Sequence, residues 1–182
     1  MTTQPLHLNT TTRPDALYLV PDRVIPRLSY VPAGRTLHLV DIENLMGGPF
    51  AGEHALQSAS AEYRRVAAVR PSDIVTVACN PALAFDAGDA WPEAELRVGP
   101  GPDGADRALL SRISDDRWVA RRFDRVVIGS GDGIFANATG ALKQWGVAVG
   151  VVSLKTSLAF PLRQCADFVW HLPEPESPEA CA

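Results

Sequence analysis

From Arg35 onward, short apolar runs rich in β-branched residues alternate with segments that repeat apolar residues at helical spacing. The short runs are TLHLVDI, DIVTVAC, AELRV, RVVIGS, VAVGVVS and DFVWHL. Helical spacing covers residues 55–67, 105–113 and 134–145, and Ser114-Asp115-Asp116 indicates the start of a further short helix. Strands that alternate with helices form βαβ units, and near-continuous apolar strands are typical of sheets covered on both faces. The pattern therefore predicts a three-layer, doubly wound α/β domain with a mainly parallel central sheet.

The 182 residues divide into three parts. Residues 35–172 carry the alternation and are long enough for one domain with its own core. Residues 1–34 include an apolar stretch that prolines divide into pieces too short for a helix. We expect them to form a partly disordered arm that lies on the domain or on a partner, either a second copy in a homodimer or another protein. Residues 173–182 are acidic and proline-rich, and we expect a disordered tail.

Composition limits the cellular setting. No apolar run approaches the ~18 residues of a membrane span, and the first residues lack the basic-then-apolar order of a signal peptide. The cysteines, Cys79, Cys165 and Cys181, are far apart, which favours neither a disulfide framework nor a zinc site. We therefore expect a cytoplasmic protein without membrane contact. The net charge of −4 weighs against a nucleic-acid partner, although the acidic tail carries much of it.

Acidic residues follow two of the predicted strands and open one predicted helix. Asp41 ends the first run, Asp132 follows the fourth, and Asp106 starts a helix after the glycine-rich stretch GPGPDGAD. In parallel sheets the carboxyl ends of the strands carry the functional groups, so these acids are expected at one edge. Crowded carboxylates repel each other, and a hard cation such as Mg²⁺ or Mn²⁺ removes the conflict. Asn44 could add a neutral oxygen or support a carboxylate. The alternative is that each aspartate simply caps the following helix.

Four stretches in order resemble the NYN domain, a branch of the PIN-like nuclease superfamily. They are LHLVDIENL, GPDGADRALL, DRVVIGSGDGIFANATGALKQWGVAVGVVS and SLAFPLRQCADFVWHL, which together span most of residues 35–172. The resemblance implies a PIN-like, Rossmannoid fold and a ribonuclease that hydrolyses RNA phosphodiesters with a water activated by Mg²⁺ or Mn²⁺. It also implies a metal held by Asp41, Asp106 and Asp132, with Asn44 orienting ligands or substrate.

The chain departs from the family pattern at two positions. Ile134 stands where the family has the second acid of an Asp-x-Asp pair, and Arg112 stands where the central helix usually offers another acid. Glu43 or Asp103 could compensate, and Ser130 could contact a metal-bound water or a phosphate. The departures favour an alternative, a catalytically weak or inactive NYN-like module that binds RNA or a protein partner.

Basic and aromatic residues are further candidates for contact with a substrate or for the core. Lys155, Arg107 and Arg112 are expected near the same edge, where they could contact RNA phosphates or remain solvated surface charges. His38, between two leucines of the first strand, is expected to be a buried, hydrogen-bonded histidine. The tryptophans are assigned to the core, with Trp91 as the candidate for exposure.

Two other classes fit the motifs less well. A phosphatase of the haloacid dehalogenase type needs an Asp two residues after its nucleophilic Asp, whereas Asp41 is followed by Glu43. A dinucleotide-binding loop needs a final glycine where GSGDGIF has Ile134, and it follows a first strand, not a fourth.

Overall fold

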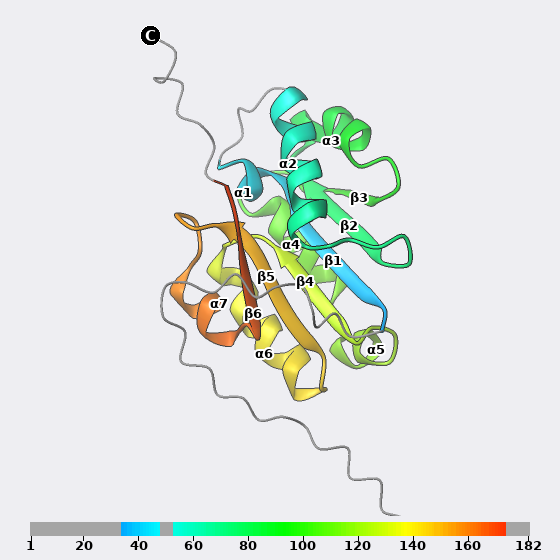
Figure 1. Cartoon of the computed structure of the whole chain (residues 1–182), viewed down its shortest axis with the longest axis vertical. Helices are drawn as coiled ribbons and strands as arrows, with labels where there is room; N and C mark the ends of the chain where they lie inside the picture. Colours follow the sequence, from blue (N-terminus) through cyan, green and yellow to red (C-terminus); the bar gives the residue numbers. More distant parts are fainter. Residues whose placement is uncertain (1–33, 48–52, 174–182) are drawn as a thin grey trace, which may run out of the picture.

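Six strands form a single sheet in the order β3-β2-β1-β4-β5-β6 in the computed structural model, which describes residues 34–47 and 53–173 (Figure 1). Every neighbouring pair of strands is parallel, so the predicted α/β class is confirmed and the sheet is parallel throughout. The strands are β1 (Thr36–Asp41), β2 (Ile74–Cys79), β3 (Glu95–Val98), β4 (Arg125–Gly129), β5 (Ala148–Leu154) and β6 (Phe168–Leu172). Apart from Gly34 and Pro173, the predicted arm (1–34) and tail (173–182) lie outside the described residues.

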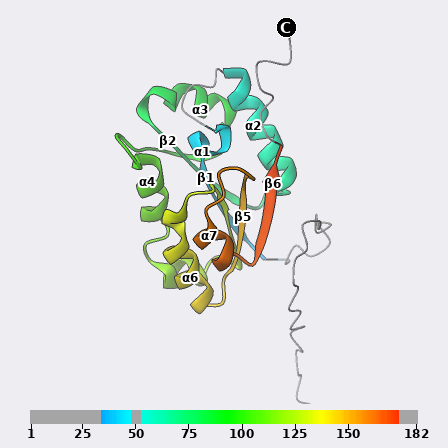
Figure 2. The same cartoon turned by 90° about the vertical axis from the view of Figure 1, so that its left-hand side faces the viewer.

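Helices cover both faces of this sheet, which gives the three layers that were predicted (Figure 2). One face packs against α1 (Ile42–Met46), α2 (Glu53–Val66) and α3 (Ala84–Ala90). The other packs against α4 (Gly104–Arg112), α5 (Asp116–Ala120), α6 (Ala136–Gln144) and α7 (Phe160–Cys165). Short 3₁₀ turns, η1 (Pro81–Leu83) and η2 (Gly133–Phe135), precede α3 and α6.

Alternation along the central strand β1 produces two separate cores. Leu37 and Leu39 point into the core beneath α4 to α7, whereas Val40 points into the core beneath α1 to α3. All residues of β1 are buried, as expected for the middle of a doubly covered sheet. Within the described parts of the chain, none of the helices has the length and apolar character needed to cross a membrane.

Two of the tryptophan predictions are wrong. Trp91 is only 3% exposed because it ends α3 against the ring of Tyr63, 5.6 Å away between centroids. Trp145 is 49% exposed because it lies just beyond the end of α6, where Arg117 stacks on its outer face at 5.4 Å.

The strand order creates a switch point between β1 and β4. From β1 the chain continues through β2 to β3 on one side, and from β4 it continues through β5 to β6 on the other. The connections that leave the carboxyl ends of β1 and β4 therefore diverge, and they open the crevice where doubly wound sheets bind ligands.

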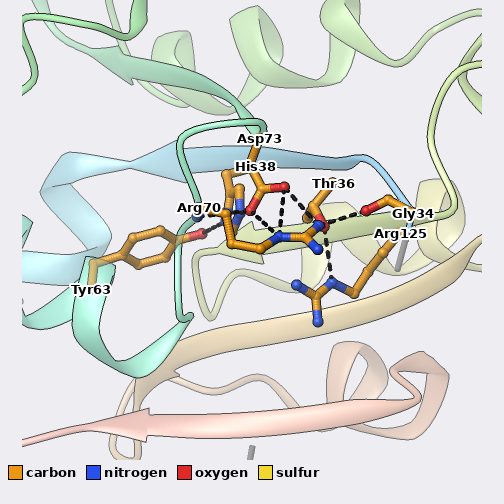
Figure 3. Close-up of polar contacts among 7 residues, drawn as sticks. All are labelled: Gly34, Thr36, His38, Tyr63, Arg70, Asp73 and Arg125. Atoms are coloured by element: carbon orange, nitrogen blue, oxygen red, sulfur yellow. Dashed lines mark hydrogen bonds and ion pairs between the residues drawn. The ribbon is translucent and has the colours of Figure 1, made fainter. Parts of the chain in front are cut away.

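The amino ends of the same strands hold a buried polar network (Figure 3). His38 is fully buried, with Nδ1 hydrogen bonded to the Tyr63 hydroxyl at 3.1 Å and Nε2 3.5 Å from Asp73 Oδ2. Arg70 donates to Asp73 Oδ1 at 2.8 Å, and Arg125 donates to Thr36 Oγ1 at 3.3 Å. Burial lowers the pKa of His38, which keeps the imidazole neutral. The expectation of a buried, hydrogen-bonded histidine is confirmed, and this network lies at the opposite end of β1 from Asp41.

Candidate functional site

Asp41 and Asp132 both cap the turn that follows their strand. The backbone amides of Glu43 and Asn44 donate to Asp41 Oδ1 at 3.1 and 3.3 Å, at the start of α1. The amide of Ile134 donates to Asp132 Oδ1 at 2.9 Å, at the start of η2. Each aspartate therefore has the capping role that an acid at a strand end commonly has. In both, these hydrogen bonds fall on one oxygen of the carboxylate.

Asp106 reaches the same edge because a tight glycine loop starts α4 beside β2. A Cβ on Gly99 would lie 2.0 Å from the Gly104 carbonyl oxygen, so the two backbones can approach only as glycines. Asp103 precedes α4 in a left-handed conformation, with φ 52°. Asp106 then falls in the first turn of the helix and is buried.

The carboxyl groups of Asp41 and Asp106 are joined by a hydrogen bond. Two carboxyls can share a hydrogen bond only while one of them keeps a proton. Burial, followed by the charge of Asp106, raises the pKa of Asp41 to about 8. Burial also raises the pKa of Asp106, and the charges of Asp132 and Asp103 add to that increase. Without a cation the pair therefore holds a proton at neutral pH.

A small cavity lies against this pair. Asp106 Oδ1 is buried and has no hydrogen-bond partner within residues 34–47 and 53–173. The cavity has a volume of about 100 Å³, which is room for several waters. Its polar lining consists of Asp41, Glu43, Asn80, Asp103, Asp106 and the loop 99–104.

The donor set of this cavity fits a hard divalent cation. Carboxylate and amide oxygens are the ligands that Mg²⁺ and Mn²⁺ prefer. The thiol of Cys79 is buried, and burial together with the charges of Glu43 and Asp41 raises its pKa to about 11. The thiolate that a soft metal requires is therefore scarce near these acids.

The acids do not form a closed metal cage. Among residues 34–47 and 53–173, no three acidic, histidine or cysteine side chains lie close enough together to hold an ion as they stand. Asp41 and Asp106 are in contact, whereas Asp132 is near enough to raise the pKa of Asp106 but does not line the cavity.

Asn44 connects the two central strand ends. Its Oδ1 accepts a hydrogen bond from the Gly131 amide at 2.7 Å. The buried Ser130 accepts a hydrogen bond from the Asp132 amide at 3.2 Å through its Oγ. Both side chains therefore shape the turn that carries Asp132.

Asn80 is a component of the cavity that sequence reasoning missed. Its backbone amide donates to Glu43 Oε1 at 2.6 Å, and its side chain caps η1. This contact holds Glu43 over the end of β2, so Glu43 lines the cavity and does not point away. The available signal was the position of Asn80 directly after a third neighbouring strand.

The candidate phosphate-binding residues are placed differently from one another. Arg112 pairs with Glu95 at 3.0 Å and stacks on Trp118 at 5.1 Å, which directs it toward the β3 edge. Arg107 is exposed, 4.0 Å from Asp103 at the mouth of the cavity. Lys155 is exposed and directly follows β5.

Comparisons with known proteins inform the fold. No protein-family model matches the sequence, and no curated protein does. The fold is similar to that of a protein of unknown function from Vibrio parahaemolyticus, solved by crystallography. The TM-score is 0.56 at 18% sequence identity, over 77% of this chain and 93% of that one. The similarity extends to the fold alone.

Proposed function

We propose that the chain is a metal-dependent ribonuclease of the NYN type, acting at the carboxyl ends of β1 and β4. The observation that carries the proposal is the buried Asp41–Asp106 pair, which retains a proton, lines a cavity and has one oxygen without a hydrogen-bond partner among the described residues. A buried acidic pair of this kind, at the switch point of a parallel sheet, is where a cation and a ligand are expected. The resemblance over residues 35–172 supplies the reaction class.

Asp41 and Asp106 would hold Mg²⁺ or Mn²⁺, and Asp132 would face the ion or its waters. The bound cation would lower the pKa of a water and stabilise the charge that develops on the phosphodiester. Asn44 keeps the Asp132 turn in place through the Gly131 amide. Glu43, fixed by the Asn80 amide, adds a further carboxylate at the cavity wall.

A site with few protein ligands suits Mg²⁺, which keeps several waters and is usually held by one or two carboxylates together with substrate phosphates. The replacement of a family acid by Ile134, which is 38% exposed, removes one carboxylate from such a site but leaves Asp41 and Asp106 in contact.

Circular single-stranded RNA tests this proposal directly. We expect Mn²⁺-dependent conversion of the circle to linear products, which requires an internal cut, and EDTA should stop it. Asp106→Asn should abolish cleavage, since it keeps the shape of the side chain but weakens the ligand. Asp89→Asn is the matched control, because this exposed side chain lies on α3 and does not line the cavity. Cleavage that persists in EDTA or in Asp106→Asn would contradict the proposal.

The second candidate is an NYN-like module that binds RNA or a protein without cleaving. It is favoured by Ile134, by the pairing of Arg112 with Glu95, and by the absence of a three-acid cluster among the described residues. RNA binding without metal-dependent cleavage would support it.

A further inference from the structure

An exposed aromatic ring lies beside the turn that carries Asp132. Phe160 is the first residue of α7 and is 71% exposed. The residue before it, Ala159, donates its amide to the Gly131 carbonyl at 2.8 Å. Figure 2 shows α7 next to β5 and α6, on the face that α4 also covers. An exposed phenylalanine is therefore fixed next to the candidate catalytic edge.

The chain around Phe160 is held in place from several sides. A Cβ on Gly131 would lie 2.4 Å from the Ser157 carbonyl oxygen, so the two backbones touch. The Ser157 hydroxyl donates to the Leu154 carbonyl at 3.3 Å. Pro161 lies in the first turn of α7, and Leu162 is fully buried beneath it. The ring is thus presented to solvent by a packed segment, which lowers the conformational entropy that a ligand would have to remove.

Positive charges flank the ring on the same segment, residues 155–163, which we term the β5–α7 segment. Lys155 begins it, and Arg163 lies one helical turn after Phe160. Both side chains are exposed, and neither forms an ion pair with any residue in the described parts of the chain. An exposed aromatic ring with cations before and after it on one segment is a combination that binds single-stranded nucleic acid, since bases stack on the ring and phosphates meet the cations.

We propose that the β5–α7 segment binds an unpaired RNA strand, with one base stacked on Phe160 and adjacent phosphates at Lys155 and Arg163. The inference rests on the proposed ribonuclease function, because the strand would lead to the acidic site. Bases within a duplex are stacked on each other and do not offer a free face to the ring. The segment therefore selects unpaired over paired RNA.

Equilibrium binding tests this proposal separately from cleavage. The probe is a fluorescently labelled oligouridine strand, measured by anisotropy with Ca²⁺ as the hard cation, and a gel verifies that the RNA stays intact. Phe160→Ala should weaken binding roughly 5- to 150-fold, the range for loss of one stacked base. Phe160→Trp should retain it. Lys155→Ala and Arg163→Ala should each reduce the slope of log K against log salt by about 0.7.

Trp145→Ala is the matched control, since Trp145 is also a half-exposed aromatic residue but lies at the far end of α6. It should bind RNA as the wild type does. Unchanged binding by Phe160→Ala, or an equal loss toward the same RNA annealed to its complement, would overturn the inference. If either result were found and the wild type still cleaved circular RNA, the ribonuclease proposal would stand. If Phe160→Ala lost RNA binding but the wild type showed no metal-dependent cleavage, RNA binding by the β5–α7 segment would be supported and the ribonuclease proposal refuted.

Discussion

Replacing Asp106 by asparagine should stabilise the metal-free protein at alkaline pH. The Asp41–Asp106 pair is buried, and the charge of Asp106 contributes to the rise in the pKa of Asp41. Asparagine keeps the size of the side chain, removes one charge and provides an amide that can donate to Asp41. The substitution therefore relieves repulsion without opening a cavity.

The size of the effect follows from the pKa of Asp41. Its rise from 3.8 to about 8 corresponds to about 6 kcal/mol at ~1.4 kcal/mol for each pH unit. Burial is the largest cause and persists in the variant, so only the part due to Asp106 is recovered. We expect a gain of about 1–3 kcal/mol, which is roughly 2–10 °C in Tm for a chain of this length.

The sign depends on pH. In the folded protein Asp41 keeps its proton up to about pH 8, whereas in the unfolded chain it loses it near 3.8. Between these values the folded state binds more protons, so the stability of the wild type falls as pH rises. Asp106→Asn should flatten this decline, and its advantage should be small at pH ~5 and largest above pH ~8.

Thermal and urea unfolding in EDTA, at several pH values, measures this difference. Asp103→Asn controls for the loss of a nearby charge, since its side chain is 61% exposed. Added Mn²⁺ should raise the Tm of the wild type more than that of Asp106→Asn, because binding to the folded state alone is stabilising. A variant less stable than the wild type at pH 8, or an equal gain in Asp103→Asn, would refute the shared-carboxylate reasoning.

Other substitutions test other parts of the structure. Asn44→Ala leaves the Gly131 amide without its acceptor and should lower the free energy of unfolding by about 1–2 kcal/mol, with a larger loss of RNA cleavage; Asn44→Asp, which retains an acceptor oxygen, should lose less stability. Asp73→Asn weakens the ion pair with Arg70, whose side chain is 30% exposed, and should cost about 1–3 kcal/mol in urea unfolding. Burial acts to raise the pKa of Asp73, but contacts with His38 and Arg70 hold it well below its ordinary value, so wild-type stability should fall as pH drops below ~4, and an unchanged acid profile in Asp73→Asn would contradict this role. Gly131→Ala would place a Cβ 2.4 Å from the Ser157 carbonyl oxygen, so a lower Tm and weaker RNA binding are expected, and a normal Tm would show that the segment is not packed as described.

The sheet was predictable because apolar runs recur along the sequence between segments of helical spacing. Each apolar run became a strand, since double burial leaves a continuous apolar signal. The short helix α3 was not predicted, because it buries Ala87 but leaves Phe85 91% exposed and so has no apolar stripe.

The acidic edge was predictable for a different reason. Parallel strands align their carboxyl ends, so residues directly after them converge whatever their separation in sequence. The cross-strand contacts were not predictable, since Asn44 and Gly131 are 87 positions apart and Glu43 and Asn80 are 37 apart. Their local sequences indicate caps and turns equally well. The ion pair of Arg112 was not predictable either. Its partner Glu95 lies on β3, and the apolar pattern of the sequence does not show where this strand lies in the sheet.

Net charge is a poor guide to partners in a fold of this kind, because the charges that matter are local. The chain carries −4 overall, which alone disfavours RNA. Yet Asp41 and Asp106 share a proton at neutral pH, so their cavity is less negative than its composition suggests. A bound divalent cation would reduce the charge further, while Lys155 and Arg163, on the segment beside Asp132, form no ion pair with any of the described residues. A strand approaching over Phe160 would therefore meet positive charge before it meets the acids. Affinity for RNA should accordingly depend on salt through these few side chains and on metal through the acidic pair, two dependences that can be measured independently.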